Sequence, residues 1–81
     1  MYIPDKLSSL ADLSIGTTGK ISSVEIDGLL RRRVLDLGMV PGTQVQCIRR
    51  SPAGDPIAFR VRNTTIALRS HDASLIKVYP I

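Results

Sequence analysis

The sequence has few of the residues that carry catalysis, covalent cross-links or aromatic stacking. It contains one cysteine, Cys47, one histidine, His71, and no tryptophan, and aromatic residues make up 4% of its 81 residues. A single cysteine excludes an internal disulfide framework and suits a reducing compartment. The scarcity of aromatic side chains argues against modules that stack single-stranded nucleic acid or grip proline-rich peptides.

Long apolar runs are also missing. The longest uninterrupted apolar runs are two or three residues, which is too short to span a membrane. The first residues, Met1 to Asp5, do not combine a basic start with an apolar core, so we expect no secretory signal. A chain of 81 residues has room for one small domain and for no deep cleft that encloses a large substrate. We therefore expect one cytosolic domain that spans 1–81.

Positive charge is in modest excess. The chain has 11 Lys and Arg residues against 7 Asp and Glu, for a formal net charge of +4. Its 43% hydrophobic and 22% charged residues are typical of a folded chain rather than a disordered one. This balance favours an anionic partner, such as nucleic acid, lipid headgroups or an acidic protein surface.

The N-terminal third predicts a helical turn and then a strand. The spacing of leucines after Ser8 indicates one short helical turn, followed by an extended segment over 13–15. Gly16 and Gly19 bracket two threonines, and this turn signal opens a strand over about 20–26.

One helix is predicted after this strand. Asp27 is suited to the N-cap position, and Gly38 is suited to ending a helix of about ten residues at positive φ. The pair Pro41-Gly42 predicts a type II turn, because glycine accepts the positive φ at the third position. Five apolar residues at helical spacing form the expected buried stripe: Ile26, Leu29, Leu30, Val34 and Leu37.

The second half of the chain predicts strands joined by turns. Residues 43–50 are typical of a strand with Val45 and Cys47 facing the core. The stretch 51–56 has the composition of a loop. The residues that we expect to shape the turns of the chain are Gly38, Pro41, Gly42, Asp55 and Pro56.

A hairpin is predicted next, because apolar and polar residues alternate on both sides of a turn. A two-residue loop at Asn63-Thr64 pairs Val61 with Ile66. The same register pairs Phe59 with Leu68, so inward side chains face inward side chains, as a hairpin requires. Threonine is a poor residue for positive φ, so a bulged variant of this hairpin is an open alternative.

The last elements complete the predicted fold. Ser70 is expected to cap a single helical turn through 71–74, and Ile76 and Val78 form a last short strand. A small antiparallel sheet must hide its edges, and closure into a barrel does so with few residues. The sequence therefore predicts a mainly β fold with one internal helix, a small SH3-like β-barrel of about five strands.

The run from Arg33 to Thr43 (Arg-Val-Leu-Asp-Leu-Gly-Met-Val-Pro-Gly-Thr) resembles the signature of the FeoA family, small proteins of bacterial ferrous-iron uptake. The likeness covers roughly residues 7 to 79. Two departures are Val34, where the family favours leucine, and Asn63, where it favours glycine. The second half agrees in register through Pro52, Gly54-Asp55-Pro56, Leu68-Arg69, Ala73, Ile76 and Val78.

This resemblance implies an SH3-like barrel in the cytoplasm, peripheral at the inner membrane face. It also implies a non-enzymatic accessory role by contact with the membrane ferrous-iron transporter and its GTP-binding domain. Whether such contact activates GTP turnover, gates the pore or stabilises the complex stays open. A related barrel forms the C-terminal domain of metal-dependent repressors, so the alternative function is a free-standing regulatory domain of that kind.

Groups for catalysis or metal binding do not converge in the sequence. Cys47 lies on the predicted core face and His71 in a polar turn, so we expect no nucleophile–base pair and no enzyme. The metal-ligand candidates are His71 with Asp72 and, separately, Glu25 with Asp27. Two adjacent ligands form at best half of a site. We therefore expect no cofactor and no dedicated metal site. Weak surface binding of a divalent metal is the expectation in place of a dedicated iron site.

The arginines are the remaining candidates for function. Three consecutive arginines, 31–33, lie about 100° apart around a helix, so they form a fanned, solvated face. Two more share the outer face of the strand over 57–62, where an acidic partner surface is first expected, with a neighbour at 69. No residue pattern indicates readout of base edges, so no nucleic-acid partner is expected. The candidate partner-binding residues are Arg60, Arg62, Arg69, Arg31 and Arg32.

Overall fold

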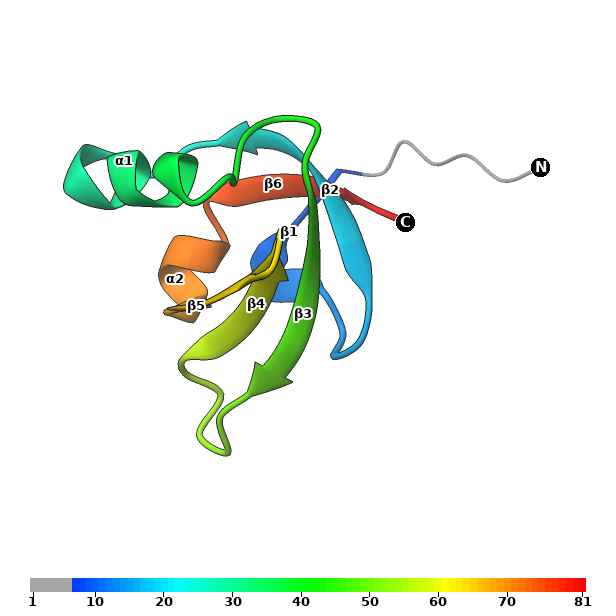
Figure 1. Ribbon diagram of the computed structural model, residues 1–81. Coiled ribbons are helices and arrows are strands. Elements are labelled where there is room, and N and C mark those ends of the chain that lie inside the picture. Colours follow the sequence, from blue (N-terminus) through cyan, green and yellow to red (C-terminus); the bar gives the residue numbers. More distant parts are fainter. Residues whose placement is uncertain (1–6) are drawn as a thin grey trace.

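The computed structural model describes residues 7–81 and shows six strands that coil around one core (Figure 1). The strands form one antiparallel sheet in the order β1-β6-β2-β3-β4-β5. The prediction of a mainly β fold with one internal helix is confirmed. The elements are β1 (Ser8–Ser9), the 3-10 helix η1 (Leu10–Asp12), β2 (Thr18–Val24), α1 (Gly28–Asp36), β3 (Gln44–Arg50), β4 (Ile57–Val61), β5 (Thr64–Leu68), α2 (Ser70–Ala73) and β6 (Ile76–Pro80).

The core lies inside the coiled sheet and draws on every long strand. Val45 and Cys47 of β3 are completely buried, as predicted, and they pair with Val61 and Phe59 of β4, which are also completely buried. Met39, between α1 and β3, and Leu10 of η1 are also completely buried in this core. Strands β2 and β3 each carry a register shift, after Ile21 and Cys47, and such irregularities bend a strand and increase its twist.

Helix α1 ends as predicted but packs less than predicted. Gly38 has a φ of +105° and Gly42 a φ of +94°, and the Thr43 N–H donates to the Val40 carbonyl at 3.0 Å, which closes the turn at Pro41-Gly42. Of the expected apolar stripe, Val34 is fully buried but Leu29 is 87% exposed. The reason is visible in Figure 1, where α1 extends away from the sheet and only its C-terminal part approaches the core.

The α1 N-cap is Asp27, as predicted, although its side chain makes no capping hydrogen bond. No helix within residues 7–81 is long and apolar enough to cross a membrane.

The β4–β5 hairpin differs from the prediction by one residue in its loop. The loop is Arg62-Asn63 rather than Asn63-Thr64, with φ values of +52° and +89°. Val61 therefore pairs with Thr64, and Phe59 with Ile66. The predicted register was wrong because a shift of two residues in pairing keeps inward side chains opposite inward side chains. The shift also frees the β-branched Thr64 from a positive φ.

The short helix α2 is capped from a distant loop. Ser70, the predicted cap, is instead its first residue; the N-cap is Arg69, which makes no side-chain capping bond. The Ser70 N–H donates to Asp55 Oδ1 at 2.6 Å, and the Ser70 hydroxyl donates to Asp55 Oδ2 at 3.0 Å. Asp55 thus stabilises the first turn of α2 from fifteen positions away, and the 51–56 loop is fixed against this helix.

Candidate functional site

The outward side chains of β3, β4 and β5 form the candidate site. Because successive side chains of a strand alternate between faces, burial of Ile57, Phe59 and Val61 turns Ala58 and Arg60 outward. Ala58 pairs with Ala67 of β5 on one side and with Arg49 of β3 on the other.

Three arginines surround this alanine pair, and we call them the arginine face: Arg49, Arg60 and Arg69. All three are exposed. Arg69 follows the buried Leu68 in extended backbone, so alternation places it on the side of Ala67. The three strands contain no aspartate or glutamate. The face therefore presents fixed positive charge around a small apolar floor.

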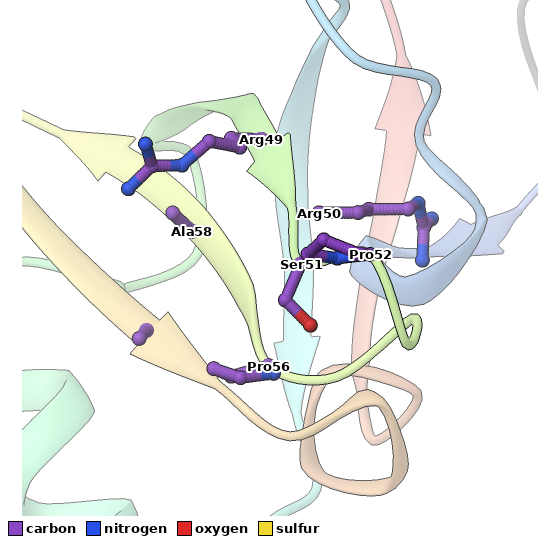
Figure 2. Close-up of a pocket in the computed structure, with 7 residues that line it drawn as sticks. Arg49, Arg50, Ser51, Pro52, Pro56 and Ala58 are labelled. Carbon is purple, nitrogen blue, oxygen red and sulfur yellow. The ribbon is translucent and has the colours of Figure 1, made fainter.

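A hollow of about 270 Å³ lies at one end of this face (Figure 2). It exists because the paired residues Ala58 of β4 and Ala67 of β5 have small side chains, whereas the next strand, β3, carries the long side chain of Arg49. Figure 2 shows the Arg49 and Arg50 side chains extending in opposite directions. The residues that line the hollow are Arg49, Arg50, Ser51, Pro52, Pro56, Ala58 and Ala67.

Arg50 has a structural role beside this hollow. Its guanidinium donates to the carbonyls of Ala11 at 2.5 Å and of Leu13 at 3.2 Å. These bonds tie the end of β3 to the segment around η1, so Arg50 is occupied while Arg49 extends into solvent. These bonds hold the end of β3, and so one side of the hollow, in place.

Asp55 lies within the influence of Arg69 and Arg50 at this end of the face, and it already accepts hydrogen bonds. The hydrogen bonds from the Ser70 N–H and the Ser70 hydroxyl lower the pKa of the Asp55 carboxyl below its ordinary 3.8, although desolvation acts in the opposite direction. The charges of Arg69 and Arg50 act in the same direction as the hydrogen bonds. Asp55 is therefore ionised near neutral pH and holds α2 rather than an external ligand.

The structure separates the arginines that the sequence grouped together. Arg60 and Arg69 lie on the arginine face, but Arg62 lies in the hairpin loop, because the loop begins one residue earlier than predicted. A Cβ placed on Gly38 would lie 2.9 Å from Arg62 Cδ and 3.0 Å from Arg62 Nε, so this side chain covers the end of α1. The expectation that Arg60 and Arg62 share one strand face is wrong.

Arg49 is the member of the face that sequence reasoning missed. Simple alternation from Val45 and Cys47 would turn Arg49 inward. The register shift after Cys47 places two residues of β3 opposite one of β4 and turns Arg49 to the side of Ala58. A charged residue at a position expected to be buried was the available signal of this irregularity.

The helix arginines fan out as predicted and do not join the face. Arg31 donates to the Val24 carbonyl. Arg31 and Arg32 line a hollow with Leu35 and Asp36 on one side of α1, whereas Arg33 lines a different hollow beside β5.

Within residues 7–81 no three histidine, cysteine, aspartate or glutamate side chains form a group that could hold a metal ion. His71 and Asp72 lie in α2, and Glu25 and Asp27 lie exposed before α1. Cys47 is fully buried, as predicted.

Comparison with known proteins agrees with a small SH3-like domain that carries one inserted helix. The FeoA domain model matches residues 8–80, and the chain belongs to this family. A solution structure of the FeoA protein from Chlorobium tepidum is 32% identical, with a TM-score of 0.85 over 90% of this chain and 70% of that one. The zinc complex of Stenotrophomonas maltophilia FeoA, described as an SH3 domain protein, is 30% identical, with a TM-score of 0.76 over 86% and 87%. The predicted family and SH3-like fold are confirmed.

Two further likenesses bear on function. An Fe(2+) transport protein A/Fe(2+) transporter FeoB fusion protein from Porphyromonas gingivalis is 33% identical over 69 residues. The match spans 85% of this chain and 8% of the fusion protein. A manganese-dependent transcriptional repressor superposes with a TM-score of 0.80 over all of this chain and 45% of its own, at 20% identity, which shows a shared fold.

Proposed function

We propose that this protein is a cytosolic, non-enzymatic accessory of bacterial ferrous-iron uptake that acts by contact with the membrane ferrous-iron transporter and its GTP-binding domain. The observation that carries the proposal is the fusion protein of Porphyromonas gingivalis, in which the related segment and a ferrous-iron transporter form one polypeptide. A covalent link holds two modules at high effective concentration, which suits partners that act on each other.

The arginine face is the surface that we propose for this contact. Arginine is enriched at protein interfaces because its planar guanidinium binds carboxylates with two parallel hydrogen bonds. Arg49 and Arg60 project from paired strands, whose packed inner faces hold them in place. The apolar floor at Ala58 and Ala67 gives a partner side chain a place to pack between the charges. An acidic surface on the transporter's cytosolic part fits this arrangement.

The test is a binding measurement of the double variant Arg49→Glu/Arg60→Glu against the purified GTP-binding domain of the transporter, at low and high salt. Exposed substitutions usually change stability by less than about 0.5 kcal/mol, so the variant is expected to fold. Charge reversal at a steering surface lowers the association rate, here by about tenfold or more at low salt, and added salt reproduces the loss in the wild type.

Arg32→Glu is the control for the single variants Arg49→Glu and Arg60→Glu, because each of them replaces one arginine by glutamate and Arg32 lies on α1, outside the arginine face. It is expected to bind like the wild type. A ferrous-iron growth assay accompanies the binding measurement. Equal association rates and equal growth for a folded Arg49→Glu/Arg60→Glu variant would contradict the proposed contact surface.

The second candidate is a regulatory domain of the metal-dependent repressor type. Its support is the superposition on a manganese-dependent repressor, and at 20% identity that likeness concerns the fold alone. Gene neighbourhood separates the two: a transporter gene beside this one favours the accessory role, and a winged-helix partner favours the regulatory one.

A further inference from the structure

We propose that the free edge of β5 and the facing side of α1 form a docking groove for an extended, acidic segment of a partner protein, which binds as an added strand. The groove adjoins the arginine face at Ala67, but its occupant is defined by pairing with the β5 backbone as well as by charge. The inference therefore holds or fails independently of the contact proposed above.

The backbone of β5 offers unpaired hydrogen-bonding groups at this edge. Among the strands of residues 7–81, β5 is the last in the sheet order and pairs only with β4. In a two-residue hairpin the residues that flank the loop exchange both hydrogen bonds, so Val61 and Thr64 form such a pair. Alternation then directs the N–H and C=O groups of Ile66 and Leu68 toward β4. Those of Thr65 and Ala67 point away from the sheet.

A hollow of about 480 Å³ lies along this edge. Five consecutive residues of β5, 64–68, line it. Neighbouring side chains of a strand point to opposite faces, so a hollow over one face would be lined by every second residue. Lining by all five indicates that the strand presents its edge. Leu30, Arg33 and Leu37 form the opposite wall.

The sequence of β5 does not protect this edge. Natural edge strands avoid unwanted pairing with charged side chains, proline or inward-pointing charges. The strand Thr64–Leu68 contains none of these, and it is five residues long. Residues of α1 instead form the opposite wall of the groove, and this wall leaves room for a single added strand. An edge left open but flanked in this way suits strand addition, in which main-chain bonds give affinity and side-chain pockets give specificity.

The walls of the groove define the side chains of the occupant. Leu30 and Ile66 are partly buried, and Leu29, which is 87% exposed, lies one helical turn before Arg33. Arg33 contributes positive charge, and no acidic residue lines the groove. A strand that alternates apolar with acidic residues would place its apolar side chains against the leucines and a carboxylate against Arg33.

The experiment uses a capped peptide of alternating glutamate and valine, seven residues long, added to uniformly nitrogen-15-labelled protein and followed by amide NMR. At peptide concentrations of roughly 1 mM, which detect weak complexes, the amides of Thr65 and Ala67 are expected to shift downfield. Their hydrogen exchange is expected to slow at least about threefold, because only outward N–H groups gain a partner. Ile66 and Leu68 serve as internal controls, since their amides are already paired with β4.

Three variants test the two sources of recognition. Arg33→Glu is expected to weaken peptide binding at least about fivefold, whereas Arg32→Glu, its neighbour on the other side of α1, leaves it unchanged. Thr65→Pro removes one outward N–H, a change that edge strands tolerate, and is expected to abolish the protection of Ala67. A matched peptide of alternating lysine and valine is expected to bind at least about tenfold more weakly.

The proposal is overturned if the peptide leaves Thr65 and Ala67 unshifted. It is also overturned if the shifts gather at Arg49 and Arg60 instead, or if Arg32→Glu weakens binding as much as Arg33→Glu. Sedimentation of the free protein tests whether a second copy occupies the groove. A dimer in which hydrogen exchange of the Thr65 amide is slowed would assign the groove to a second copy and overturn the proposal. None of these results affects the Arg49→Glu/Arg60→Glu test, so the two proposals fail separately.

Discussion

Replacement of Gly38 by alanine tests how the end of α1 is held against the β4–β5 hairpin. Gly38 has a φ of +105°, and a Cβ at this position would lie 2.9 Å from Arg62 Cδ. Two separate costs are therefore expected, one from the backbone and one from the displaced arginine. Gly42 provides the matched control, because its φ is +94° and, apart from its chain neighbours, no atom of residues 7–81 lies within 4 Å of a Cβ placed there.

The magnitudes follow from these two geometries. Positive φ costs an L-residue about 1–2 kcal/mol, which applies to Gly38→Ala and Gly42→Ala alike. Moving the flexible Arg62 side chain off its rotamer adds about 0.5–1.5 kcal/mol at Gly38 alone. For a domain of this size 1 kcal/mol corresponds to about 4–8 °C in Tm. Gly42→Ala is thus expected to lower the Tm by about 4–16 °C, and Gly38→Ala by several degrees more.

The assay is thermal and urea unfolding of both alanine variants, each also made in an Arg62→Ala background. The extra loss at Gly38 is expected to disappear when Arg62 is truncated, while the loss at Gly42 is unchanged, because a double-mutant cycle isolates the contact. Equal losses at the two glycines in the parent would show that Arg62 does not cover α1. A neutral Gly38→Ala would show that the end of the helix is misplaced.

Two further predictions concern ionisable groups. Because the pKa of Asp55 is lowered in the folded state, its contribution to stability is present above its ordinary pKa of 3.8 and is lost as the pH falls through the folded value. Asp55→Asn is expected to remove this part of the pH dependence of stability, measured by unfolding curves from pH 7 to 2. A variant that keeps the same dependence would refute the assignment. Anaerobic titration of the protein with ferrous iron or zinc is expected to reveal no one-to-one site tighter than about micromolar, because too few ligands converge, and a tight isotherm lost in His71→Ala would contradict this.

The local features of the chain followed from the sequence. Gly38 and Gly42 supply the positive φ that a helix end and a type II turn need, and few other residues do so without strain. Alternation identified the buried side of β3 and β4, because one face of each strand must carry the core residues Cys47 and Phe59. These inferences depend on neighbours in the chain. The family signature around Gly38 likewise predicts the fold without reference to any tertiary contact.

The pairing of strands was only half determined. Alternation states which face of β5 is buried, but two registers that differ by two residues satisfy it equally. The conformation of the loop chose between them, since Arg62-Asn63 adopts positive φ and leaves Thr64 in the strand. This choice moved Arg62 away from Arg60 and so changed the composition of the candidate interface.

The candidate surfaces themselves were decided by tertiary structure. Arg49 joins Arg60 because a register shift in β3 turns Arg49 outward, and strand alternation alone does not predict that shift. Asp55 reaches Ser70 across fifteen positions because the strands between them fold back as a hairpin. Leu29 obeys the helical period yet stays exposed, because periodicity gives the direction of a side chain and not whether another element lies there. Only the packed arrangement supplies that second fact.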